Sequence, residues 1–233
     1  MQKIIVIGFP HTGTTILKSI IGHIDEVEEI IHEEKEIRQE DIDNASSNKK
    51  FIMCKWPFAR DHYFDQAYQD YIKIFIIRNP LWIFSSLNKR CAKDDPPGIP
   101  PNHGIDTYIE VCKKFLYYQK NPTKNVHLIK YEDMFDDNYQ VLKNLFNTIG
   151  FNYHNDIFNN SKYTNFSHRN ITQVPNNIVD HTDHENFRTW QINQKFVNNN
   201  IPEKIDLLPE QITQILSSDD ILNLYPELAC VRM

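Results

Sequence analysis

The sequence predicts an α/β protein with three layers (α/β/α), in which helices cover both faces of a central parallel sheet of about four or five strands. Short apolar runs, most of them rich in isoleucine or valine, alternate with amphipathic segments of helical period. The first apolar run leads into a glycine-bracketed turn and then a helix, which is the strand-turn-helix unit of a P-loop. A ligand site is therefore expected at the carboxyl ends of the strands.

Each element follows from its own pattern. Buried parallel strands are expected at residues 3–8, 50–55, 71–78 and 125–130, and a further short strand near 27–31 is compatible with the sequence. Helices are expected at residues 14–23, 60–70, 81–90, 105–119 and 131–149. Gly150 is the expected C-cap of the last of these. Two short terminal helices are expected at 209–216 and 219–225.

The composition is that of a soluble globular protein, with 40% hydrophobic and 24% charged residues. A formal net charge of −6 argues against bulk binding of nucleic acid, but an anionic small ligand needs only a local cluster of donors. Apolar runs stay short of the about 18 residues of a membrane helix, and the first strand leaves no room for a signal peptide. Four scattered cysteines without metal spacing indicate free thiols in a reducing compartment, hence a cytoplasmic protein; they are Cys54, Cys91, Cys112 and Cys230.

The turn after the first strand is suited to an anion. Gly8 and Gly13 bracket it, and the helix that follows presents unpaired N–H groups and the positive end of its dipole. The residue after the second glycine is Thr14, whereas nucleoside triphosphatases carry lysine there. The pattern therefore favours phosphate binding without the equipment of a kinase; the alternative is an ordinary turn without a ligand.

A second anion site is expected where the third strand ends. Arg78 follows this strand, Pro80 suits the first turn of the next helix, and Ser86 lies eight positions after the arginine. A guanidinium with a hydroxyl makes a cradle for a separate phosphate. The alternative is that Arg78 pairs with a carboxylate.

With these residues in place, the chain resembles the sulfotransferase superfamily, whose donor is 3′-phosphoadenylyl sulfate (PAPS). The resemblance rests on four motifs, of which the first three have the family's order and spacing. They are Gly8-Phe-Pro10-His11-Thr12-Gly13-Thr14-Thr15-Ile-Leu17, Arg78-Asn79-Pro80 with Ser86, Tyr131-Glu132-Asp133-Met134, and the weaker Phe187-Arg188-Thr-Trp190.

The resemblance implies in-line transfer of a sulfuryl group from PAPS to an acceptor hydroxyl or amine, with PAP (adenosine 3′,5′-bisphosphate) as the product and no metal required. Residues 10–15 would hold the 5′-phosphosulfate, and Arg78 with Ser86 the 3′-phosphate. Tyr131 would lie near the nucleotide and Arg188 would close over it. Alternatively, Tyr131 begins a helix and Arg188 is a surface residue. One domain over 1–233 is expected, with a nucleotide-binding core at 1–150 and a C-terminal segment at 151–233 that closes over the nucleotide.

The catalytic residues depart from the family pattern. His11 stands where relatives carry lysine or arginine, and Lys55 matches a strand-end lysine of many relatives. The histidine base of one branch is missing, because Trp56 and Pro57 follow the lysine. Glu33 fits the place of the glutamate base used by other branches, although it could be one more exposed acid; His62 is the backup base, with Asp61 beside it.

The acceptor is expected to be a small molecule, or else a saccharide. Several aromatic residues follow Lys55 or Arg78 and either pack in the core or line an acceptor pocket; they are Trp56, Phe58, Tyr63, Phe64, Trp82 and Phe84. The Pro-rich stretch 94–104 is either a lid or a surface loop. Two other functions fit the sequence, a P-loop kinase-like enzyme and a non-catalytic protein that binds PAP or another nucleotide. No membrane or nucleic-acid partner is expected, and the sequence carries no signal for the oligomeric state.

Overall fold

A parallel sheet of five strands, in the order β2-β3-β1-β4-β5, forms the centre of the chain in a computed structural model that describes residues 1–30, 36–92, 98–158, 196, 198, 200 and 205–230. The strands are β1 (Gln2–Ile7), β2 (Val27–Glu29), β3 (Phe51–Trp56), β4 (Ile72–Ile77) and β5 (Val126–Lys130). Central β1 pairs with β3 and β4, so that Val6 lies opposite both Lys55 and Ile74. The predicted class and strand number are confirmed.

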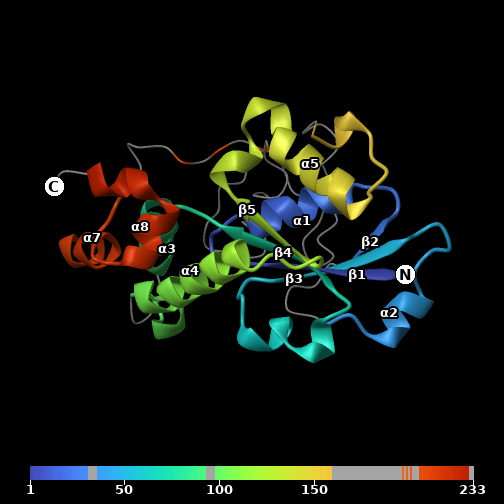
Figure 1. Cartoon of the computed structure of the whole chain (residues 1–233), viewed down its shortest axis with the longest axis horizontal. Helices are drawn as coiled ribbons and strands as arrows, with labels where there is room; N and C mark the ends of the chain where they lie inside the picture. Colours follow the sequence, from blue (N-terminus) through green and yellow to red (C-terminus); the bar gives the residue numbers. More distant parts are fainter. Residues whose placement is uncertain are drawn as a thin grey trace.

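Helices cover both faces of the sheet (Figure 1). They are α1 (Thr14–Gly22), α2 (Gln39–Asp43), α3 (Pro80–Cys91), α4 (Ile105–Lys120), α5 (Gln140–Ile149), α7 (Pro209–Leu216) and α8 (Asp219–Leu224). Alternate side chains of β1 enter two separate cores: Ile4 packs with residues of α1 and α5, whereas Ile5 packs with residues of α3 and α4. This alternation produces the three-layer arrangement that the sequence predicts.

Two predicted helices are wrong in extent. Residues 60–70 form two short 3₁₀ turns, Asp61–Phe64 and Gln66–Tyr68, because the intervening Asp65 is extended (φ −72°, ψ 172°). Within residues 131–149 the α-helix starts only at Gln140, after short 3₁₀ turns, because residues 137–139 adopt positive φ angles that do not fit a right-handed α-helix. Gly150 ends α5 with φ 89°, which confirms the predicted C-cap.

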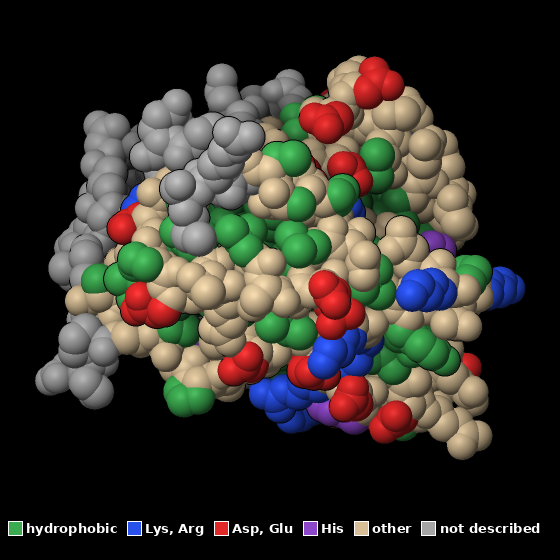
Figure 2. Space-filling view, turned by 60° about the vertical axis from the view of Figure 1, so that its left-hand side comes forward, with side chains coloured by type: hydrophobic (Ala, Val, Ile, Leu, Met, Phe, Trp, Pro, Cys, Tyr) green, Lys and Arg blue, Asp and Glu red, His purple; other side chains and the backbone are tan. Residues whose placement is uncertain are grey.

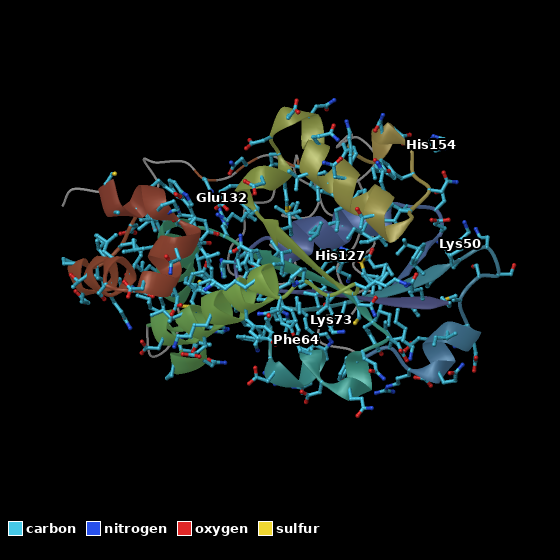
Figure 3. All side chains as sticks on the ribbon, in the orientation of Figure 1. Lys50, Phe64, Lys73, His127, Glu132 and His154 are labelled. Atoms are coloured by element: carbon cyan, nitrogen blue, oxygen red, sulfur yellow. The ribbon has the colours of Figure 1, made fainter. Side chains whose placement is uncertain are left out.

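The carboxyl ends of the strands meet at one edge of the sheet. Figure 3 shows this direction on β5, where His127 lies within the strand and Glu132 lies beyond its carboxyl end. Figure 2 shows acidic and basic side chains intermixed over the visible face rather than a continuous basic surface, in keeping with the net charge of −6. Among the helices in the described part of the chain, none is long and apolar enough to cross a membrane.

Candidate functional site

The turn between β1 and α1 is held in shape by Thr12. Its hydroxyl donates to the carbonyl oxygen of Phe9 (2.7 Å) and accepts from the Phe9 N–H (3.3 Å). Thr12 is fully buried and Pro10 is buried beside it, so both belong to the scaffold of the turn. A Cβ atom at Gly8 would lie 2.6 Å from the carbonyl oxygen of Ile76, which explains why a glycine stands directly after β1, beside β4.

Gly13 and Tyr131 are packed against each other. Gly13 has φ +95°, and a Cβ atom there would lie 2.4 Å from Cδ2 of the Tyr131 ring. The guanidinium of Arg78 lies over the same ring, with 4.2 Å between its Cζ atom and the ring centroid. Tyr131 is only 1% exposed. Tyr131 therefore supports both the turn and the arginine, a packing role that the motif alone did not predict.

Lys55 lies beside the first turn of α1. Its register opposite Val6 places it at the carboxyl end of β3, next to the strand that carries the turn. The ammonium Nζ donates to Oγ1 of Thr15 (2.8 Å), and Lys55 is 1% exposed. Thr14, the first residue of α1, is buried, whereas Thr15 is half-buried. A cation and the N-terminal N–H groups of a helix thus point to the same edge.

Arg78 follows β4 and is oriented by neutral groups. Its Nε donates to Oδ1 of Asn200 (2.8 Å), and its Nη1 donates to the carbonyl oxygen of His11 (3.1 Å). Arg78 is 9% exposed, and burial lowers the pKa of its guanidinium. Because an arginine pKa starts so high, the group remains charged at neutral pH. The structure thus holds a buried cation at the predicted edge.

His11 joins the two predicted anion sites. Its backbone is in the left-handed region (φ 67°), which directs its carbonyl oxygen to Arg78 and its ring to α3. Nδ1 of the ring lies 2.7 Å from the hydroxyl oxygen of Ser86, which is half-buried. The turn after β1 and the helix after β4 are therefore in direct contact through side chains.

Glu132 and Asn200 extend this cluster, and neither was predicted as a site residue. Oε1 of Glu132 accepts from the backbone N–H of Asn79 (2.8 Å) and from Nδ2 of Asn200 (2.9 Å). Burial raises the pKa of Glu132, an effect that these hydrogen bonds partly offset. Glu132 stands inside the Tyr131–Met134 motif, which was a usable signal, whereas Asn200 follows an Asn-rich stretch without any pattern.

Three of the predicted residues are not part of this cluster as described. Glu33 and Arg188 lie outside the described residues. His62 is exposed, and its ring packs against the ring of Tyr63, with 3.9 Å between the two centroids. Tyr63 belongs to the core on the face of the sheet that α4 covers. The first turn of α1 contributes to the opposite core. The ring of His62 thus contacts Tyr63 and Tyr68, whereas Lys55 contacts Thr15 of α1.

A groove of about 800 Å³ runs between α4 and residues 58–65. Aromatic and charged side chains line it together, among them Phe58, Phe64, Tyr117, Tyr118 and Lys114. The backbone of Ala59 connects it to the turn, because its N–H donates to the carbonyl oxygen of Gly8 (2.7 Å) and its carbonyl accepts from Nζ of Lys114 (2.7 Å). Of the other aromatic candidates, Tyr63 and Phe84 are core residues.

Metal ligands are not gathered in the described part of the chain. No group of three or more His, Cys, Asp or Glu side chains there could hold a metal ion. At the sheet edge in that part, the buried side-chain cations are Lys55 and Arg78.

Comparison with known proteins gives matches in structure but not in sequence. No protein-family model and no curated protein matches the sequence. The mouse sulfotransferase SULT7A1 complexed with PAP matches with a TM-score of 0.59 at 15% identity, over 98% of this chain and 89% of that chain. The sulfotransferase domain of the Synechococcus PCC 7002 olefin synthase has a TM-score of 0.46 at 13% identity, over 68% and 76% of the two chains. Retinol dehydratase in complex with androsterone and inactive cofactor PAP has a TM-score of 0.45 at 11% identity, over 71% and 67%.

Proposed function

From the sulfotransferase fold of this chain, we propose that it is a sulfotransferase that moves a sulfuryl group from PAPS to a hydroxyl or amine of a small-molecule or saccharide acceptor. The observation that carries the proposal is the contact between Arg78 and the carbonyl oxygen of His11, 3.1 Å apart. It joins a buried cation after β4 to the glycine-bracketed turn after β1, so one nucleotide with two separate phosphates can reach both.

In this proposal residues 10–15 bind the 5′-phosphosulfate, through main-chain N–H groups near the start of α1; Pro10 has no N–H and contributes only to the shape of the turn. Arg78 and Ser86 bind the 3′-phosphate. Tyr131 acts through its packing on Gly13 and Arg78. The segment 151–233 closes over the nucleotide, with support from Asn200, which reaches Arg78, and with Arg188 as a further contact.

The donor supplies an activated sulfuryl group. Lys55 and His11 stabilise the negative charge that develops on the sulfuryl oxygens and on the leaving phosphate. Lys55 is already oriented by Thr15. The acceptor oxygen or nitrogen bonds to sulfur as the bond from sulfur to the 5′-phosphate oxygen breaks, and the acceptor proton passes to a base. Glu33 is the proposed base, with His62 in reserve.

The acceptor is proposed to enter beside Phe58 and Phe64, which line the groove along α4. A cytoplasmic location is also part of the proposal, because Cys54, Cys112 and Cys230 are free thiols among the described residues.

Two measurements test the proposal. PAP and PAPS should raise the melting temperature, whereas ATP with magnesium should not. Labelled PAPS incubated with a panel of phenols, alcohols, amines and sugars should yield a labelled product. Arg78→Ala is the control, because losing a buried charged contact should weaken PAP binding by about 2–5 kcal/mol. Stabilisation by magnesium-ATP alone would support a kinase-like enzyme, and tight PAP binding without transfer a non-catalytic protein.

A further inference from the structure

In the described part of the chain, the guanidinium of Arg78 makes its hydrogen bonds and its ring contact with neutral partners, although the charge of Glu132 acts on it from beyond contact distance. The neutral partners are the amide oxygen of Asn200, the carbonyl oxygen of His11 and the ring of Tyr131. A guanidinium bound in this way is fixed in orientation, but its charge is not cancelled. Such an arginine is prepared for an anion that arrives from outside.

The carboxylate of Glu132 nevertheless lies close to this guanidinium, with only the side chain of Asn200 between them. Nδ2 of Asn200 donates to Oε1 of Glu132 (2.9 Å) while Oδ1 of Asn200 accepts from Nε of Arg78 (2.8 Å). The side-chain amide of Asn200 thus lies between the Glu132 carboxylate and the Arg78 guanidinium and hydrogen-bonds to both. Among the residues that the structure describes, Arg78 and Glu132 form no direct ion pair.

The second carboxylate oxygen of Glu132, Oε2, shows why the separation of Glu132 from Arg78 matters. Oε2 is buried and has no hydrogen-bond partner among the described residues. Such an atom is costly to bury, and a direct pair with a guanidinium would satisfy it. Without the intervening amide, Glu132 would gain by turning to Arg78 and cancelling its charge.

We propose that Asn200 is a positioning residue, whose amide orients Arg78 and keeps Glu132 from pairing with it, so that the guanidinium stays available to the 3′-phosphate. This inference rests on the proposed function for the identity of the anion. Glu132 in turn positions Asn200, because its Oε1 accepts hydrogen bonds from the Asn200 amide and from the backbone N–H of Asn79.

An exchange of charge between the two residues tests this role. Asn200→Asp puts a carboxylate against Nε of Arg78, and PAP affinity measured by calorimetry should fall at least about tenfold, or about 1.4 kcal/mol. The double variant Asn200→Asp/Glu132→Gln has the net charge of the wild type but keeps the carboxylate in direct contact, so its affinity should stay low. Asn147→Asp, on the exposed side of α5, is the matched control and should change the affinity by less than about twofold.

The outcomes separate the alternatives. Recovery of wild-type affinity in the double variant would show that only net charge matters, and this would overturn the proposal. Wild-type affinity in Asn200→Asp alone would overturn it as well.

A second readout requires no nucleotide. The Nε–H resonance of Arg78, identified by its loss in Arg78→Lys, should be protected from exchange with water in the wild type and unprotected in Asn200→Ala. Equal protection in both proteins would contradict the positioning role. If the wild type binds no PAP, the proposed function fails, and the exchange measurement still decides whether Asn200 orients the arginine.

Discussion

Nδ1 of His11 lies 2.7 Å from the hydroxyl oxygen of Ser86, which joins the turn after β1 to the helix after β4. The family resemblance assigns these residues to opposite ends of one nucleotide. In the structure they bond to each other instead, so PAP would have to replace this hydrogen bond with bonds of its own. The contact between His11 and Ser86 is therefore a competitor of the proposed ligand.

His11→Lys should strengthen PAP binding. The lysine removes the ring that bonds to Ser86 and adds a permanent charge beside the turn, and a charge-assisted bond to phosphate is about twice as strong as a neutral one. We expect a gain in affinity of about threefold to tenfold, measured by calorimetry. Ser86→Ala is the control that breaks the same bond without adding charge. Equal affinities for His11→Lys and His11→Ala would mean that charge at this position has no effect.

Lys55→Met should lower turnover much more than donor affinity. Methionine fills the buried space of the lysine stem but cannot donate to Thr15 or to a developing negative charge. Loss of one such donor lowers the rate about 100-fold or more, so we expect a fall of that order in the rate of sulfuryl transfer with PAP affinity changed less than about threefold. Thr15→Val tests whether the hydroxyl matters only as a support for the ammonium. A loss that falls on affinity alone would reassign Lys55 to nucleotide binding.

Gly13→Ala should destabilise the protein more than Gly150→Ala. Both glycines have positive φ angles, +95° and +89°, so alanine strains the backbone at either position. A Cβ atom at Gly13 would also lie 2.4 Å from the Tyr131 ring, whereas at Gly150 nothing lies within 4 Å. We expect about 3 kcal/mol for Gly13→Ala and about 1 kcal/mol for Gly150→Ala, from urea unfolding. Equal losses would mean that Tyr131 does not pack tightly on the turn.

Glu132→Gln should change the pH dependence of stability. Burial raises the pKa of Glu132 in the folded protein above its ordinary value of 4.5. At a pH between 4.5 and the raised pKa, the folded protein therefore binds more protons than the unfolded chain. The free energy of unfolding of the wild type therefore loses this contribution as the pH rises through that window. Glutamine does not titrate, so the stability of the variant relative to the wild type should increase as the pH rises from 4.5 through the raised pKa of Glu132.

The exposed Glu110 provides the control for this measurement. It pairs with Lys113 on the surface of α4, and Glu110→Gln removes a carboxylate without touching a buried network. A difference between Glu132→Gln and the wild type that stays constant with pH would contradict the assignment of a raised pKa to Glu132.

The strands and most helices could be predicted because their signals are local. Buried strands such as β4 contain apolar runs, here residues 74–77, and Pro80 and Gly150 mark a helix start and end by backbone geometry alone. The two helix errors have a different origin. The extended Asp65 and the left-handed Tyr139 break segments whose side-chain period is helical, and the sequence pattern does not encode those backbone angles.

The candidate site was predictable as far as it depends on strand ends. Lys55 lies at the carboxyl end of β3 and Arg78 directly follows β4, on either side of β1, so topology alone brings them to one edge. The role of Asn200 depends on its contact with Arg78, which lies 122 residues earlier in the sequence, and no local pattern predicts that contact. Thr12 and Tyr131 show a further limit, because a motif identifies the residue but not whether its side chain faces a ligand or the scaffold.

Ala59 offers a route to inhibition at a distance. Its peptide groups connect the groove along α4 to the turn after β1, through bonds to Lys114 on one side and Gly8 on the other. A drug-like compound that fills the groove and draws the Lys114 ammonium to itself would release one end of this connection. It would then act on the turn that is proposed to hold the 5′-phosphosulfate without competing with the nucleotide, so a high cellular level of the proposed donor would not displace it.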